Sequence, residues 1–201
     1  MLEAGRILVP LDGSPLSERS LPYAISLARA LHGRLVLMIA AYLSEIPEHG
    51  PWSSEMAAHP HETCTAYLES VKQRVAHPDT ELLVKVGYPH EAILEAAREV
   101  DASLIVASTH GRSGLSRWVY GSTARDLLHD VHIPLLAIGR NVPDRDGSGF
   151  SPAHVLVPLD GSALGEAALP YALELTRAFG AKVSLVRVAP CSVEAYPLMV
   201  P

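Results

Sequence analysis

A glycine-rich stretch in the middle of the chain has the residue types of an anion site. It reads ASTHGRSGLSRWVYGST over residues 107–123, follows a strand-like apolar run and leads into the helical pattern STARDLLHD. Gly111 comes directly after the strand, and Gly121, Ser122 and Thr123 open the helix. Backbone N–H groups and the macrodipole at a helix N-terminus attract phosphate, and glycine lets the backbone approach it closely. The stretch therefore predicts a phosphate site. The alternative is an ordinary turn, since most glycine-rich turns after strands bind nothing.

A carboxylate follows a second buried strand. The motif LVPLDGS over residues 8–14 places Asp12 at the carboxyl end of the first strand. Open α/β sheets bind ligands where the strand order reverses, at the carboxyl ends of the strands. We therefore expect Asp12 and the 107–123 loop on either side of such a point. Asp12 would then hydrogen-bond a base or a ribose while the loop amides hold phosphates.

The elements that position these residues occur in a repeat. LVPLDGS returns at residues 156–162, and when Leu8 is aligned with Leu156 more than half of the next thirty positions are identical. Such similarity indicates an internal duplication. Each copy reads as a strand, a helix capped by Ser14 or Ser162 and ended by Gly33 or Gly180, and a returning strand, which is a β-α-β unit of a parallel sheet.

Only the first copy continues far enough to complete a domain. Residues 44–60 read as a long loop, and further helices and strands follow it at 61–76, 81–87, 88–100, 102–108, 122–131 and 133–139. The sequence thus predicts an α/β fold, a doubly wound five-stranded parallel sheet with helices on both faces, over residues 1–139. Residues 140–152 read as a linker. Residues 153–201 form a truncated second repeat without the glycine-rich loop, so Asp160, the counterpart of Asp12, is expected to be structural or vestigial.

Three motifs, in this order and spacing, resemble those of the universal stress protein family. They are ILVPLDGS at 7–14, GYPHEAI at 87–93, and STHGRSGLSRWVYGST followed by IPLLAIG, which ends at residue 139. In ATP-binding members the loop reads Gly-x-x-Gly, nine residues, then Gly-Ser/Thr. Gly111, Gly121 and Ser122 match this pattern, whereas Ser108 stands where the first glycine is usual.

The resemblance implies an adenine-nucleotide α-hydrolase-like fold with ATP, accompanied by Mg²⁺, across the carboxyl ends of the strands. It implies that Pro10, Leu11 and Asp12 lie at the adenine, that Ala40 packs on the ring, and that Ala107 and Ser108 border the ribose. The phosphates would be held by Gly111, Gly121, Ser122 and Thr123, with Arg112 adding charge-assisted bonds. It also implies a homodimer through the strand at 133–139.

Three functions remain open at this point. The first is a nucleotide-dependent regulator of the stress response. The second is an ATP-independent dimeric interaction protein of the same fold, which Ser108 favours. The third is an enzyme that hydrolyses ATP slowly or transfers adenylate; the loop has no lysine and no obvious base, which argues against fast chemistry.

Composition and residue spacing exclude several classes of partner and ligand. The net charge of -6 and the lack of any Lys/Arg run argue against a nucleic-acid partner. The apolar runs are too short for a membrane span and the N-terminus does not read as a secretion signal, so we expect a cytoplasmic protein. His49, His59, His61 and Cys64 fit no zinc spacing, so no metal site from side chains is expected.

Overall fold

The computed structural model describes residues 2, 5–41, 60–109, 122–139, 142 and 149–188. The chain divides into two compact units, Met1–Ser151 and Pro152–Pro201, called unit 1 and unit 2 below. Each unit is described by itself. In the described residues no helix is both long and apolar enough to cross a membrane.

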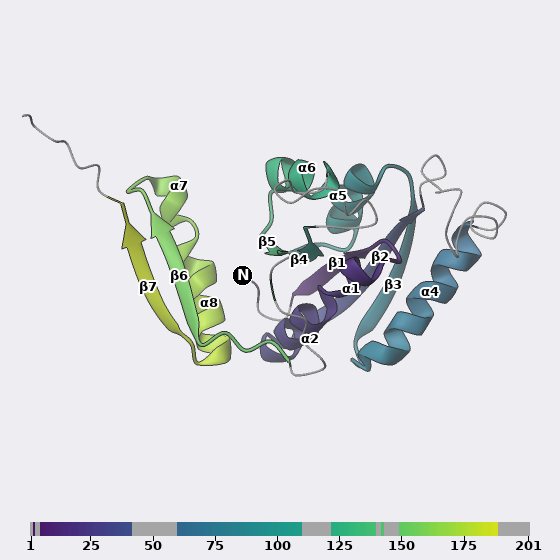
Figure 1. The fold of residues 1–201 in the computed structure, drawn as a ribbon, viewed down its shortest axis with the longest axis horizontal. Helices are drawn as coiled ribbons and strands as arrows, with labels where there is room; N and C mark the ends of the chain where they lie inside the picture. The colour runs from purple at the N-terminus through teal and green to yellow at the C-terminus, as the bar shows by residue number, and fades with distance from the viewer. Residues whose placement is uncertain are drawn as a thin grey trace, which may run out of the picture. The chain divides into compact units, whose positions relative to one another are not determined.

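Unit 1 is built on a five-stranded parallel sheet with the strand order β3-β2-β1-β4-β5 (Figure 1). Its described elements are β1 (Arg6–Leu11), α1 (Pro15–Glu18), α2 (Leu21–Ala30), β2 (Arg34–Ala41), α4 (Pro60–Val75), β3 (Thr80–Val86), α5 (Pro89–Glu99), β4 (Ala102–Ser108), α6 (Ser122–Asp130) and β5 (Leu135–Ile138). The predicted doubly wound α/β fold with five strands is confirmed.

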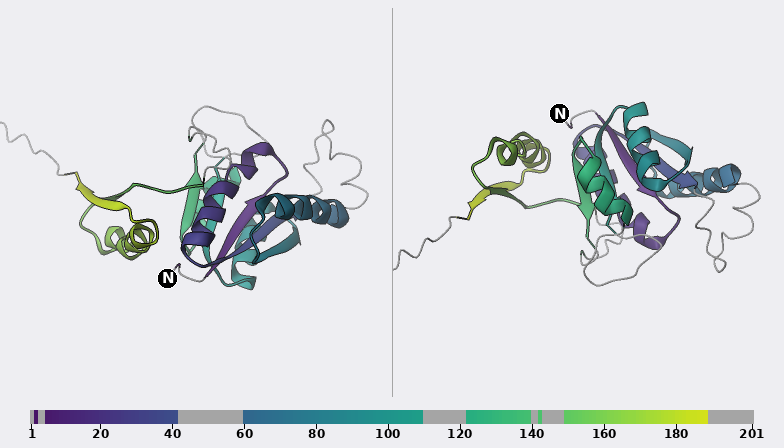
Figure 2. Two further views of the ribbon diagram at one scale, coloured as in Figure 1. Left: turned by 90° about the horizontal axis from the view of Figure 1, so that it is seen from below. Right: turned by 90° about the horizontal axis from the view of Figure 1, so that it is seen from above.

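Helices cover both faces of this sheet. Figure 2 shows α1, α2 and α4 on one face and α5 and α6 on the other. Pro89 opens α5, where a missing N–H is not needed, and the helix then buries Ala92, Ile93, Ala96 and Ala97. These residues share one core cluster with sheet residues Leu8, Val36 and Met38 and with Leu127 of α6. The cluster fixes α6 to the sheet directly after the glycine-rich stretch.

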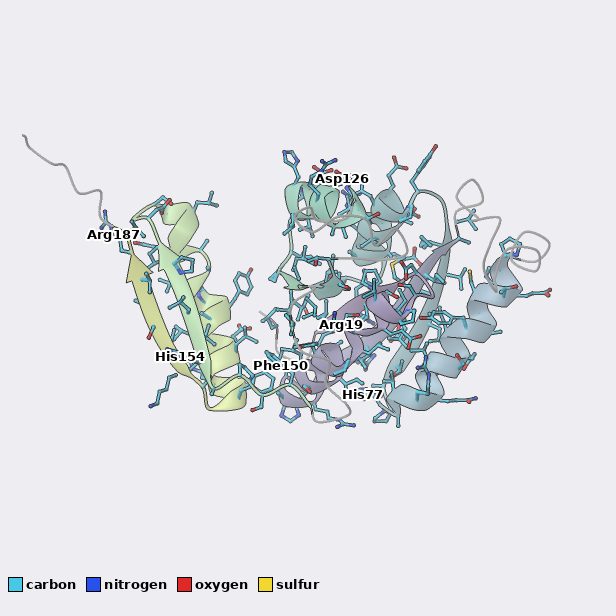
Figure 3. All side chains as sticks on the ribbon, viewed as in Figure 1. Arg19, His77, Asp126, Phe150, His154 and Arg187 are labelled. Carbon is cyan, nitrogen blue, oxygen red and sulfur yellow. The ribbon has the colours of Figure 1, made fainter. Side chains whose placement is uncertain are left out.

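The first crossover contains two helices where the sequence predicts one. Ser14 caps α1, because its Oγ accepts the N–H of Ser17 at 3.2 Å. After one turn the chain starts again with α2, which has Pro22 in its first turn. The C-terminal end of unit 1 returns to α2, since the ring centroids of Tyr23 and Phe150 are 5.0 Å apart (Figure 3).

The helix end of the first repeat differs from the sequence prediction, whereas that of the second repeat agrees with it. In the second repeat Gly180 ends its helix at a φ of 65°, as predicted. In the first repeat the residue with positive φ is His32, at 53°, and not Gly33. Gly33 serves a different purpose, since a Cβ at this position would lie 2.7 Å from the carbonyl oxygen of Gly5. The first glycine therefore permits a close backbone approach, while a histidine takes the left-handed position.

We expect His32→Gly to stabilise unit 1. A non-glycine residue in the left-handed region is strained, and glycine removes this strain for a gain of roughly 0.5–1 kcal/mol. Denaturant unfolding followed by tryptophan fluorescence measures it, because both tryptophans, Trp52 and Trp118, lie in unit 1. The control is Arg29→Gly in the same helix, which should destabilise by about 1 kcal/mol. A lower midpoint for His32→Gly would contradict this explanation of the helix end.

In the described residues of unit 2, β6 (His154–Leu159) and β7 (Lys182–Arg187) form one parallel strand pair. Between them lie α7 (Ala163–Glu166) and α8 (Leu169–Phe179). This strand pair is more exposed than its counterpart in unit 1, the pair β1 and β2. Leu156 is 62% exposed, whereas the equivalent Leu8 is fully buried. The described part of unit 2 thus repeats β1 to β2 only.

Candidate functional site

The carboxyl ends of β1 and β4 lie at the point where the strand order reverses. On one side of β1 the sheet continues with β2 and then β3, and on the other side it continues with β4 and then β5. Registered pairing between β1 and β4 runs from Arg6↔Ala102 to Leu8↔Ile105, and the last three residues of each strand lie beyond it. Such a switch point is where open α/β sheets bind ligands.

The structure brings four of the predicted residues to this edge. Pro10 and Leu11 end β1, and Ala107 and Ser108 end β4, where they are paired with Ala137 and Ile138 of β5. Leu11 is 4% exposed and belongs to the core, while Pro10 and Ser108 are partly buried. The two strand ends therefore offer backbone and small side chains at one edge.

Ala40 lies near the end of the neighbouring strand β2, opposite Lys85 of β3. It is partly buried and packs against the same core cluster that contains Ala107 and Leu8. Two alanines from β2 and β4 therefore share one face of the sheet on either side of β1. Small apolar residues in these positions suit contact with a flat apolar group.

Asp12 forms a hydrogen-bonded turn over residues 12–17, called the Asp12 turn below. Its Oδ1 accepts the N–H of Ser14 at 2.9 Å and the Oγ–H of Ser14 at 2.6 Å. Its own N–H donates to the Oγ of Ser17 at 3.2 Å. Gly13 has a φ of 80°, a conformation that glycine adopts without strain. The turn holds a carboxylate at the carboxyl edge of the sheet.

The second repeat forms the same turn over residues 160–165, where no glycine-rich loop follows in the sequence. Asp160 Oδ1 accepts the N–H and the Oγ–H of Ser162 at 2.8 and 2.7 Å. These bonds lower the pKa of the Asp160 carboxyl. The turn is thus a property of the Asp-Gly-Ser sequence, and Asp160 makes the same bonds in it as Asp12. One difference is that Gly165 replaces Ser17, so the second turn lacks the Ser17 hydroxyl.

The phosphate end of the predicted site is described only in part. α6 starts at Ser122, of which the structure describes the backbone, and Thr123 lies partly buried in its first turn. Gly111, Arg112 and Gly121 lie outside the described residues. Leu127, 1% exposed, anchors α6 in the core. The N-terminus of α6, where the helix dipole is positive, therefore directly follows the glycine-rich stretch in the sequence.

A side-chain cluster that the sequence does not reveal ties α4 to the Asp12 turn. Glu18, the last residue of α1, accepts two hydrogen bonds from Arg74, at 2.8 and 3.0 Å, and one from the Tyr67 hydroxyl at 2.9 Å. Tyr67 and Arg74 are 49 and 56 residues away in sequence, so no local pattern links them to Glu18. Only the helical spacing that places both on one face of α4 hints at a common partner.

Hydrogen bonding and burial shift the pKa values of this cluster. The bond to Arg74 lowers the pKa of the Glu18 carboxyl below its usual value, so Glu18 is ionised at neutral pH. The ion pair therefore contributes to stability above the usual pKa, and this contribution is lost as the pH falls through the lowered one. Burial, followed by the charges of Glu18 and Asp12, raises the pKa of Tyr67. The Asp12 carboxylate thus lies within electrostatic reach of the Tyr67 hydroxyl.

The residues considered as metal ligands do not gather in the described part of the chain. His61 is exposed at the start of α4, whereas Cys64, one turn later, is fully buried. His49 and His59 lie outside the described residues. Where the chain is described, no group of three His, Cys, Asp or Glu side chains could hold a metal ion.

The match to a known protein family covers both repeats of this chain. The model of the universal stress protein family matches residues 3–139 and 153–200. Universal stress protein MJ0531 of Methanocaldococcus jannaschii is 28% identical over 140 residues, which cover 66% of this chain and 81% of that protein. Universal stress protein YxiE of Bacillus subtilis is 30% identical over 146 residues, 66% of this chain and 97% of that protein.

Two solved structures share the fold. A universal stress protein from Archaeoglobus fulgidus superposes with a TM-score of 0.73 at 21% identity, over 96% of this chain and 69% of that one. A universal stress protein in complex with cAMP superposes with a TM-score of 0.52 at 23% identity, over 67% of this chain and 96% of that one. At these identities the superpositions establish the fold.

Proposed function

Because the chain belongs to the universal stress protein family, we propose that unit 1 binds ATP with Mg²⁺ and acts as a nucleotide-dependent regulator of the stress response. The observation that carries the proposal is the geometry of the switch point. The ends of β1 and β4, which lie beyond the pairing of these two strands with each other, and the N-terminus of α6, directly after a glycine-rich stretch, belong to one edge of the sheet. A relative of the same fold has been solved with cAMP, another adenine nucleotide.

Charge sets the orientation of the nucleotide in this proposal. The triphosphate is repelled by the Asp12 carboxylate and attracted by the N-terminus of α6. The phosphates therefore lie along the 107–123 loop, where Gly111, Gly121, Ser122, Thr123 and Arg112 are the proposed contacts. Mg²⁺ is held there by the phosphates themselves, and it neutralises part of their charge.

The nucleoside then occupies the other end of the site. The adenine lies between the ends of β1 and β2, with Pro10, Leu11 and Asp12 beside it and Ala40 packed on its ring. The ribose lies at the end of β4 next to Ala107 and Ser108. The small side chains that share a face around Ala40 and Ala107 support this placement.

Calorimetric titration of the whole chain with ATP and Mg²⁺ tests the proposal. We expect saturable binding with one nucleotide per molecule of residues 1–201, which contain one glycine-rich loop of this kind, at 107–123. GTP titrated in the same way reports on the preference for the adenine base. Absence of heat from protein that a thermal unfolding scan shows to be folded would contradict the proposal.

That outcome would favour the second candidate, an ATP-independent dimeric protein of the same fold. Ser108 is the residue that favours it, because a side chain stands where ATP-binding members have a glycine. The dimer proposed for either function uses β5, which is an edge strand of the sheet and so offers unpaired backbone groups. Light scattering of the whole chain reports its mass directly.

A further inference from the structure

The Asp12 turn is connected to α4 by an unbroken series of hydrogen bonds. Ser17 accepts the N–H of Asp12 through its Oγ, and its own N–H donates to Ser14 Oγ at 3.2 Å. Ser17 is 5% exposed, so these bonds are shielded from water. The next residue is Glu18, whose N–H donates to the Ser14 carbonyl oxygen at 3.3 Å and whose carboxylate is held by α4.

The second repeat shows the same turn without this connection. Glu166 is the counterpart of Glu18, but the described part of unit 2, residues 152–188, has no counterpart of α4. Gly165 also lacks the hydroxyl with which Ser17 holds the aspartate N–H. In the described residues, α4 thus fixes the turn of the first repeat, while the second repeat has the same Asp-Gly-Ser turn without such a helix of its own.

We propose that Glu18, held by Tyr67 and Arg74, is a positioning residue that fixes the Asp12 turn and thereby sets the affinity for the nucleoside end of the ligand. The nucleoside part of this inference rests on the proposed function. Loss of the carboxylate frees α1 from α4 and lets the turn move. The N-terminus of α6 is held through α5 and the opposite face of the sheet, so the phosphate end is unaffected.

The first test needs no ligand. Hydrogen exchange of the whole chain is compared between the wild type, Glu18→Gln and the matched variant Glu166→Gln. We expect faster exchange of the Asp12 and Ser17 amides in Glu18→Gln only, with β1 and β2 protected as before. Unchanged exchange of these amides would overturn the positioning role, whatever the chain binds.

The second test separates the two ends of the ligand. ATP and inorganic tripolyphosphate, each with Mg²⁺, are titrated into the wild type, Glu18→Gln, Tyr67→Phe and Glu166→Gln. We expect ATP binding to weaken about fivefold in Glu18→Gln and less in Tyr67→Phe. Tripolyphosphate binding should be unchanged, and Glu166→Gln should match the wild type for both probes.

If Glu18→Gln weakened the binding of ATP and tripolyphosphate equally, a general loss of stability would explain the result and the inference would be overturned. Unchanged ATP binding in Glu18→Gln would also overturn it. If the wild type binds neither probe, the proposed function fails, and the nucleoside part of the inference fails with it. The exchange result then still decides whether Glu18 fixes the turn. The two failures are therefore distinguishable.

Discussion

Gly121→Asp is expected to weaken ATP binding by about 100-fold, the largest effect that the account predicts. Gly121 directly precedes Ser122, the first residue of α6, in the stretch that the sequence assigns to the phosphates. A carboxylate there places a negative charge against the triphosphate, and its side chain adds bulk where the proposed site brings the backbone close to the phosphates. Both effects act on the bound state, whereas the fold keeps its core contacts through Leu127.

The matched control is Leu128→Asp, which adds the same charge to the same helix. Leu128 is 47% exposed and lies six residues beyond the start of α6, so its substitution leaves the N-terminus free. Fluorescence titration with a labelled ATP compares the two variants with the wild type. Unchanged affinity in folded Gly121→Asp would contradict the assignment of the phosphates to this loop.

Leu37→Ala is expected to destabilise unit 1 by about 2–5 kcal/mol. Leu37 lies in the middle of β2, is fully buried and is paired with Leu82 of β3. Its truncation removes apolar contacts and leaves a cavity that the packed sheet does not refill. Denaturant unfolding followed by the fluorescence of Trp52 and Trp118 reports on unit 1 alone.

The repeat provides the control for this prediction. Leu185 is the counterpart of Leu37 in β7 but is 57% exposed, so Leu185→Ala removes little buried surface. We expect it to leave the tryptophan transition in place. A similar cost for both substitutions, or no cost for Leu37→Ala, would contradict the burial that distinguishes the two repeats.

Much of the fold of unit 1 follows from local patterns. The β-branched and leucine-rich strands, the helical spacing of α5 with Pro89 at its start, and the caps at Ser14 and Ser162 are all found where the sequence places them. These features depend on neighbours within a few residues. The strand order follows because β-α-β crossovers of uniform hand leave few arrangements open.

The rest depends on contacts between distant segments. Gly33 was expected to end its helix, but His32 takes the left-handed position, and Gly33 instead makes room for the carbonyl of Gly5, which is far away in sequence. Glu18 meets Tyr67 and Arg74 only after the sheet has placed α4 beside α1. For the candidate site, the sequence placed Leu11 at the end of β1 and Ser108 at the end of β4, where the structure has them, but it did not reveal the bonds that hold Asp12 in its turn. The nucleotide-binding role of these residues stays a prediction.

The central claim is that one of two similar repeats binds a nucleotide at the carboxyl ends of β1 and β4. Hydrogen exchange of the whole chain with and without ATP and Mg²⁺ tests it most directly, because LVPLDGS occurs in both repeats and its flanking residues distinguish the two peptides. We expect ATP-dependent protection of residues 8–14 and 107–123 and none of residues 156–162. Equal protection of both copies, or no protection of the 107–123 stretch, would contradict it.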